Sequence, residues 1–368
     1  MKHSAARTLT VVVGALAASV TLAGQAPGAR PDSTKIEGVE NVKSFVASRV
    51  RENWTVPRTP WGDPDIAGIF TTKDEANTPL ERPAEWAGRK MDDITSSEFE
   101  AAVAKRQQLA LETAPFAGGG EPEEGVAIAV PIHWFDNLNA KNSRAWFVID
   151  PVEGKIPEMT AEGKRLAKAS IERRAVPEGA AKTRGGRRDS YTDRNLGDRC
   201  IGFGPWRQPG IYGNSFQIIQ SKDHVVLRQE QIHEARIVPL DGRAPVPGAI
   251  RSYLGHATGH WEGNTLVVVT TNFNPNMDIR NLGPIGGAFI PAGNLRLIER
   301  FTRIAPGRVE WTMTFDDPTI WTHPWTYSLP MTEDDKQIIH EYACHEGNFG
   351  MANLLSAGRK ADQGLAPK

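Results

Sequence analysis

The second half of the sequence constrains the fold most, because it alternates short β-branched and aromatic runs with turn sequences. Residues 259–273 show this clearly: the Glu-Gly-Asn turn at 262–264 separates an aromatic run from a run of valines and threonines. Other turns rich in Gly, Pro or Asp separate most of the remaining runs. The pattern predicts nine strands, at residues 215–220, 225–231, 235–240, 252–261, 265–271, 295–304, 308–315, 322–329 and 337–344.

Short links between these strands predict a mainly β fold. Strands joined by tight turns run antiparallel, and closing such a sheet on itself removes its exposed edges. We therefore expect an up-and-down meander that closes into a barrel-like, calycin-like core.

The portion before this core is predicted to be loop-rich and partly helical. Good helix formers indicate helices at 42–51, 96–113 and 160–173, and a short strand is expected at 144–150. Several prolines and glycines between 53 and 70 predict a looped approach to the core.

The N-terminus has the pattern of an export signal. Basic residues precede an apolar stretch at 9–22, and a Gly-Gln-Ala sequence ending at Ala26 resembles a cleavage site. The apolar stretch is too short for a stable membrane span. We expect a secreted or periplasmic protein that is not inserted in a membrane in its mature form. The predicted organisation is a signal peptide at 1–26, a poorly ordered segment at 27–60, a mixed helix and loop portion at 61–198 that packs on the barrel, a β-barrel domain at 199–357 and a flexible tail at 358–368.

The composition is that of an ordinary globular protein, with 39% hydrophobic and 24% charged residues in a chain of 368. A net charge of −1 gives no overall attraction to nucleic acid, so none is expected as a partner. Motifs of serine hydrolases, nucleotide sites and dinucleotide sites are missing, and we expect no cofactor. A metal is not expected either: His256 and His260 have the spacing of helical ligands, but the neighbouring glycines argue against a helix.

The chain has two cysteines, Cys200 and Cys344. An exported protein reaches an oxidising compartment, so we predict one disulfide between them. The alternative is a pair of buried thiols. A nucleophilic cysteine would need an activating environment that the sequence does not indicate.

Five motifs are distinctive: FQIIQ at 216–220, IHEARIVPLDGR at 232–243, GHWEGNTLVV at 259–268, ERFTR at 299–303 and EYACHEGN at 341–348. Together they resemble a widespread family of secreted bacterial proteins of uncharacterised function. The similarity extends from about Trp61 to Ser356 and implies secretion and a shared β core, without a reaction. This chain departs from the family pattern at His256 and Arg296, which would imply a different substrate if these positions line the site.

Glu299 is the first candidate catalytic residue. In the strand predicted at 295–304, it is the one charged residue on a face shared with Leu295, Leu297 and Phe301. Burial there would raise its pKa and suit it to general acid or base catalysis. The alternative is a structural ion pair with an arginine such as Arg300 or Arg303.

An aromatic face is expected on the next-to-last predicted strand, where Trp321, His323, Trp325 and Tyr327 alternate with other residues. His323 could carry a proton beside tryptophans that stack on a sugar or planar ligand. The alternative is an aromatic core with one hydrogen-bonded histidine.

The segment around Cys344 offers further candidates. On a strand, His340 would share a face with Tyr342 and Cys344, and the following His345, Glu346 and Asn348 could point into the mouth of the barrel. The alternative is a polar strand end that closes the barrel.

The IHEAR motif brings His233 and Glu234 close to Arg236. Arg236 could bind a substrate carboxylate with both guanidinium nitrogens, or it could neutralise a nearby glutamate.

These candidates together predict an enzyme that uses acid–base chemistry without a metal, as a lyase, isomerase or hydrolase. Its substrate would be a small polar, sugar-like or aromatic molecule. Glu299 would exchange a proton with one of the histidines, Arg236 or Arg300 would bind an anionic group, and His260 is a further binding candidate. The alternative function is a non-catalytic binder of a small molecule or glycan.

Overall fold

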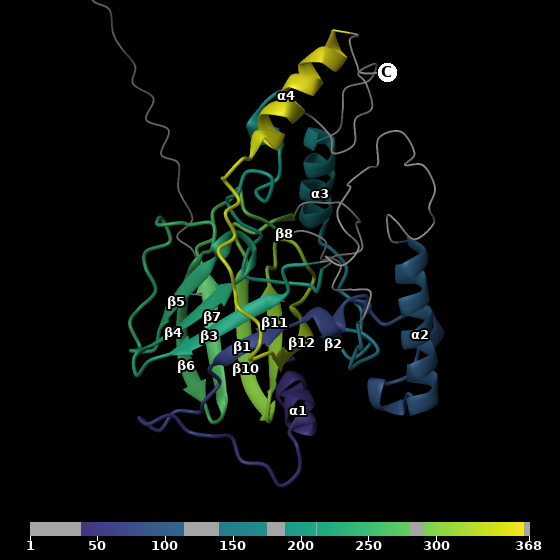
Figure 1. The fold of residues 1–368 in the computed structure, drawn as a ribbon, viewed down its shortest axis with the longest axis vertical. Coiled ribbons are helices and arrows are strands. Elements are labelled where there is room, and N and C mark those ends of the chain that lie inside the picture. The colour runs from purple at the N-terminus through teal and green to yellow at the C-terminus, as the bar shows by residue number, and fades with distance from the viewer. Residues whose placement is uncertain (1–37, 114–139, 175–187, 211, 280–289, 364–368) are drawn as a thin grey trace, which may run out of the picture.

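The computed structural model describes residues 38–113, 140–174, 188–210, 212–279 and 290–363. Within them the protein is mainly β, with a large antiparallel sheet curled into a nearly closed barrel (Figure 1). The predicted barrel-like fold is therefore confirmed. The predicted signal peptide at 1–26 lies outside the described residues.

The large sheet has ten strands. Their order across the sheet is β5-β4-β3-β1-β12-β11-β10-β7-β6, and β2 pairs with β12 beside this path. The strands are β1 (Gly68–Thr71), β2 (Val148–Asp150), β3 (Ser215–Gln220), β4 (His224–Gln229), β5 (Ala235–Pro239), β6 (His256–Glu262), β7 (Thr265–Thr271), β10 (Arg296–Ala305), β11 (Arg308–Asp316) and β12 (Trp325–Glu333), while β8 (Asp278–Ile279) and β9 (Ile290–Pro291) form a separate pair.

Two consecutive meanders make up most of the barrel, and β1 joins them. One meander is β3-β4-β5, and the other runs through β6, β7, β10, β11 and β12. β1 pairs with β3 on one side and with β12 on the other, so a strand from the N-terminal portion completes the sheet. It begins in the stretch predicted to be looped, because Gly68 and the nearby prolines are typical of loops and the strand has only four residues.

The prediction of a strand at 337–344 is wrong. After β12 the chain forms turns and irregular structure over these residues, without a strand. Both neighbours of β12 are already occupied, by β11 and by β1 and β2, so no edge remains nearby for another strand. Cys344 is instead tied to Cys200 by the predicted disulfide, with 5.6 Å between the Cα atoms.

The interior of the barrel is filled with aromatic and aliphatic side chains. Trp311 stacks on Phe301, with 5.4 Å between ring centroids, and Phe315 stacks on Trp325 at 4.6 Å. Such pairs contribute beyond the burial of apolar area, by roughly 0.5–1.5 kcal/mol each. These side chains form one continuous core on the inner face of the curved sheet.

The barrel closes between β5 and β6, the two ends of the strand order. A Cβ atom built on Gly259 of β6 would lie 2.8 Å from Val238 and 2.9 Å from Leu240. Those distances are shorter than real Cβ contacts, so the glycine lets the segment containing β5 approach β6 closely.

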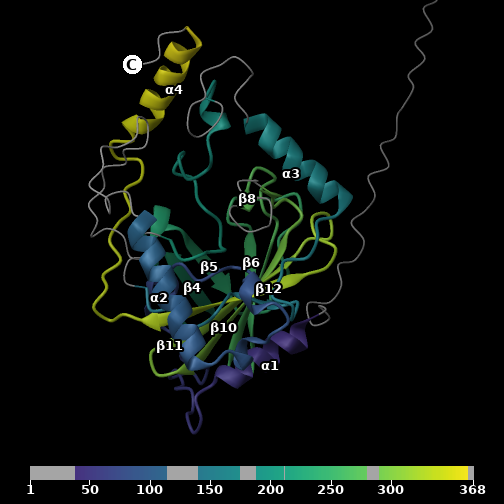
Figure 2. The same ribbon diagram turned by 90° about the vertical axis from the view of Figure 1, so that its right-hand side faces the viewer.

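Four α-helices are found among the described residues: α1 (Val39–Arg49), α2 (Ser96–Thr113), α3 (Ala161–Arg174) and α4 (Phe349–Asp362). Figures 1 and 2 show α3 and α4 toward one end of the molecule and α1 toward the other, against the barrel. α1 packs Val39 on Val267 and Ile298, on the outer face of the sheet. The predicted boundary between residues 357 and 358 falls inside α4. No described helix combines the length and the apolar composition that a membrane span requires.

Candidate functional site

Glu299 lies inside the barrel, as its strand pattern predicts, and is 0% exposed. Arg236 of β5 binds both of its carboxylate oxygens, at 2.5 and 2.8 Å. Between them, the interior positions on β7 and β6 carry Val268 and Gly259, whose small size leaves room for the long arginine side chain. The ion pair therefore spans the closing edge of the barrel, and neither Arg300 nor Arg303 is its partner.

Glu234 is a second buried carboxyl group, two residues before Arg236 and 7% exposed. Its Oε1 accepts a hydrogen bond from the backbone N–H of Phe203 at 2.9 Å. Its Oε2 is buried and has no hydrogen-bond partner among the described residues. Burial raises the pKa of Glu234 to about 7, although the Phe203 bond and the guanidinium groups of Arg207 and Arg236 oppose the shift.

Arg207 and Tyr327 continue this polar group. The hydroxyl of Tyr327 donates to the backbone carbonyl of Arg207 at 2.5 Å, and the Arg207 guanidinium donates to the carbonyl of Gly213 at 3.0 Å and to Gln231. Burial lowers the pKa of Arg207, and the nearby Glu234 opposes that change. Two arginines, two glutamates and a tyrosine thus lie near one another where residues 200–210 cover the barrel.

The backbone is strained next to this group. Ile232 has a φ of 55°, a left-handed conformation that a β-branched residue rarely adopts. Such strain persists only where the surroundings enforce it, and it occurs often at functional sites. The bend orients Glu234 towards the 202–204 segment and begins β5 at Ala235. His233 lies in the short helix η7 (Gln231–His233), but its side chain is outside the described part.

Trp321 and Trp325 are fully buried, and their rings are 5.6 Å apart. Both rings pack on Phe315, so protein side chains occupy the faces that were expected to stack on a ligand. His323 does not share their face. It is exposed before the start of β12, with Nδ1 3.2 Å from the carbonyl of Pro324.

The segment containing Cys344 follows the surface. His340, His345 and Glu346 are exposed. Asn348 is exposed too, and its side-chain amide donates to the carbonyl of Asp198 at 3.3 Å. The structure therefore does not bring these side chains together with Glu299.

The last two predicted residues lie on the outside of the barrel. His260 is exposed on β6, with Nε2 3.2 Å from Glu262. Arg300 is on the outer face of β10, opposite to Glu299, and α1 covers it. Within the residues that the structure describes, no group of three or more His, Cys, Asp or Glu side chains is placed to hold a metal ion.

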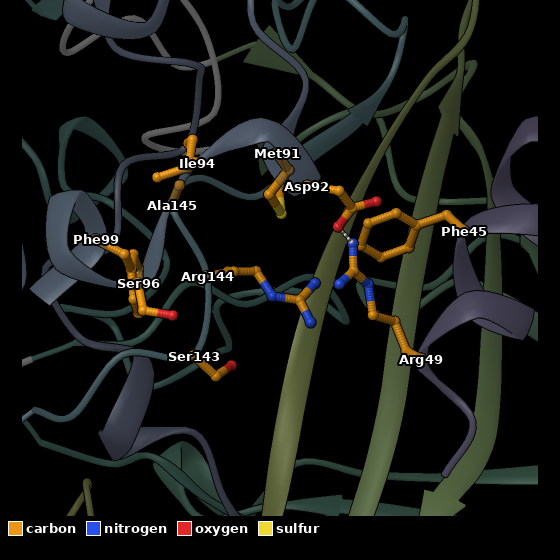
Figure 3. Close-up of a pocket in the computed structure, with 10 residues that line it drawn as sticks. All are labelled: Phe45, Arg49, Met91, Asp92, Ile94, Ser96, Phe99, Ser143, Arg144 and Ala145. Atoms are coloured by element: carbon orange, nitrogen blue, oxygen red, sulfur yellow. Dashed lines mark hydrogen bonds and ion pairs between the residues drawn. The ribbon is translucent and has the colours of Figure 1, made fainter. Parts of the chain in front are cut away.

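A cleft of about 290 Å³ opens between α1 and the start of α2 (Figure 3). Arg144 forms its floor and is paired with Glu310, with 2.9 Å between Nη1 and Oε1. Arg49 and Asp92 form an ion pair at its side, at 2.5 Å. None of the predicted site residues lines this cleft.

Comparison with models of protein families finds no match to this sequence, and no curated protein matches it. The family resemblance of the five motifs stays a prediction. The structure places two of those motifs side by side, since Arg236 of IHEAR binds Glu299 of ERFTR.

Three residues of the polar group were given no site role from the sequence: Glu234 and Tyr327, which were named only as neighbours of other candidates, and Arg207, which was not singled out. The IHEAR motif contained the signal for Glu234, because residues two apart in an extended chain share a face, and Arg236 faces the interior of the barrel. Arg207 lies in a segment without a strand pattern, and only the fold places it beside Glu234.

Proposed function

We propose that the protein is an enzyme that uses acid–base chemistry, with Glu234 as the group that exchanges the proton. The observation that supports this most is its buried carboxyl group, which has a pKa of about 7 and one oxygen that no described residue hydrogen-bonds. A group with a pKa near the working pH can both give and take a proton. The reaction class is that of a lyase, isomerase or hydrolase.

The neighbouring charges indicate the kind of substrate. Arg236 is occupied by Glu299, whereas the Arg207 guanidinium donates to a carbonyl and to Gln231, and no carboxylate among the described residues binds it directly. A guanidinium group of this kind favours a substrate carboxylate. We propose a small polar molecule with an anionic group, such as a sugar acid, as the substrate.

Conversion of a substrate panel in D2O tests the proposal. The panel holds uronic acids, hydroxy acids and aromatic glycosides, and proton NMR detects both deuterium incorporation and new products. We expect conversion by the wild-type protein and a loss of at least a hundredfold in Glu234→Gln, which keeps the shape but not the acid.

The matched control is Glu230→Gln, which changes a nearby glutamate whose Oε2 accepts a bond from the backbone of Ser215. It should keep most of the activity. Full activity in Glu234→Gln, or no conversion of any panel member by the wild type, would contradict the proposal.

We further propose that the protein is secreted or periplasmic. The export pattern ending at Ala26 supports this location, and the disulfide is compatible with an oxidising compartment. N-terminal sequencing of protein recovered from a bacterial periplasm tests whether cleavage occurs near Ala26.

A second candidate function is non-catalytic binding of a small molecule or glycan. The observation that favours it is that sizeable cavities lie against α1, outside the barrel and away from Glu234. In that case Glu234→Gln would leave ligand binding unchanged.

A further inference from the structure

A second cavity, of about 410 Å³, lies between α1 and the outer face of β7 and β10. This volume is within the usual range of ligand pockets, roughly 300–1,000 Å³. The cavity lies on the other side of α1 from the cleft in Figure 3, and it shares none of that cleft's lining residues. The cavity is lined by residues of α1, by the residue that follows it and by residues of the sheet. They are Val42, Lys43, Val46 and Ala47 of α1, then Val50, and Glu262, Thr265, Arg300 and Thr302 of the sheet.

Arg300 is the polar group at the bottom of this cavity. Its side chain is buried, with the residue only 4% exposed. Nε and Nη1 are both buried, and neither has a hydrogen-bond partner among the described residues. A buried charge of this kind is costly unless something pairs with it, and burial lowers the pKa of Arg300.

The other walls have two distinct characters. The side formed by α1 is aliphatic, because Val42 and Val46 are spaced by four residues and share one face of the helix, and Val50 directly follows the helix. Thr265 and Thr302 bond to each other through their hydroxyls at 2.8 Å, so they compete little for the guanidinium.

Arg300 and Lys43 are the positive residues of the lining, and Glu262 is its one acidic residue. Lys43 is paired with Glu40 at 3.4 Å and lies 3.7 Å from Glu262. Glu262 and Glu40 favour the charged form of Arg300 from a distance, but neither hydrogen-bonds its Nε or Nη1, so among the described residues these atoms have no direct carboxylate partner.

We propose that this cavity binds a monocarboxylate with a short aliphatic chain, the carboxylate on Arg300 and the chain along the valines of α1. The planar guanidinium matches a carboxylate in shape and can donate two parallel hydrogen bonds. Glu234 directly precedes β5 and does not line this cavity. The proposed binding site therefore does not depend on the proposed acid–base activity.

Calorimetry with octanoate tests the proposal. We expect the wild-type protein to bind octanoate, and to bind 1-octanol and butyrate at least tenfold more weakly, because these lack the charge and the chain respectively. Arg300→Met should weaken octanoate binding at least tenfold. The same variant should melt at a higher temperature than the wild type when no ligand is present, since it removes a buried guanidinium whose Nε and Nη1 no described residue hydrogen-bonds.

Two further variants make the result decisive. Arg296→Met removes an arginine from the same face of β10, one that pairs with Asp316 and does not line the cavity, and should leave octanoate binding unchanged. Val46→Phe fills the cavity from α1 and should abolish binding with Arg300 intact. Equal octanoate binding by wild type and Arg300→Met, unchanged binding in Val46→Phe, or no binding by the wild type at millimolar octanoate would overturn the proposal.

Discussion

At the scale of single residues, the barrel interior contains two charged side chains among apolar ones. Glu299 and Arg236 neutralise each other in an ion pair in which both carboxylate oxygens are bound. A buried pair contributes little net stability, but loss of one partner is strongly destabilising, by roughly 3–5 kcal/mol. The pair therefore specifies how β5 meets β10 across the barrel more than it adds to stability.

No arginine among the described residues binds Glu234 in this two-point way, and its raised pKa makes a prediction for stability. The folded protein holds a proton on this carboxyl up to about pH 7, whereas the unfolded chain releases it near its ordinary value of 4.5. The protonated carboxyl therefore contributes to the free energy of unfolding in full below pH 4.5, and this contribution is lost as the pH rises through 7. Between pH 5 and pH 8 the wild type should lose about 2–3 kcal/mol relative to Glu234→Gln.

Urea unfolding at the two pH values measures this difference. The control is Glu162→Gln on α3, where an ion pair with Arg165 lowers the pKa of an exposed carboxyl. The contribution of Glu162 to the free energy of unfolding is present above pH 4.5 and is constant between pH 5 and 8. Glu162→Gln should therefore show the same change in stability between these two pH values as the wild type. Parallel pH curves for the wild type and Glu234→Gln would show that Glu234 is ionised at neutral pH.

The sequence predicted the position of Glu299 but not its partner. Strand alternation is a local property, and it placed Glu299 on the same buried face as Leu297 and Phe301. Its partner lies 63 residues away, on a strand at the opposite end of the sheet order. The same limit applies to Trp321 and Trp325, because a shared aromatic face fits both a core and a ligand wall.

At the scale of elements, strong local signals were predicted well. The strands predicted at 215–220 and 265–271 are found with these bounds, as is the helix at 96–113. Predictions failed where pairing decides the outcome: β1 is a strand because both β3 and β12 offer it an edge, and residues 337–344 find none. Helix α4, outside the predicted strands, was missed as well.

The contact of β5 with β6 makes a prediction at this scale. Gly259→Val adds a branched side chain where even a Cβ would be under 3 Å from Val238 and Leu240. We expect it to reduce the free energy of unfolding by about 1–3 kcal/mol, the usual cost of overpacking a core. Adding Val238→Ala should recover part of this loss, because it removes the atoms that clash.

Urea titration of the single and double variants measures the coupling. Gly248→Val is the matched control, since a Cβ at Gly248 has no atom within 4 Å and should change stability by less than about 0.5 kcal/mol. If Gly259→Val were as stable as Gly248→Val, β5 and β6 would not be held in close contact.

At the scale of the whole molecule, one covalent bond and one short strand connect parts that are distant in sequence. β1 brings the N-terminal portion into the sheet, and the disulfide ties the chain after β12 to the segment that covers the polar group. Asn348 supports that link through its bond to Asp198. The covering segment is thus held from two sides, by Tyr327 and Glu234 from the barrel and by Cys344 from the C-terminal part.

Removal of the disulfide should therefore affect both stability and the covering segment. The cysteines are 144 residues apart, and cross-linking a loop of that length stabilises by about 5 kcal/mol in the chain-entropy model. We expect the double variant Cys200→Ser, Cys344→Ser to lose a large part of this in urea unfolding. Limited proteolysis should cut it first between 334 and 348, where the chain has few backbone bonds to the barrel. Unchanged stability and an unchanged cleavage pattern would mean that Asn348 and the packing of the covering segment hold these parts together without the bond.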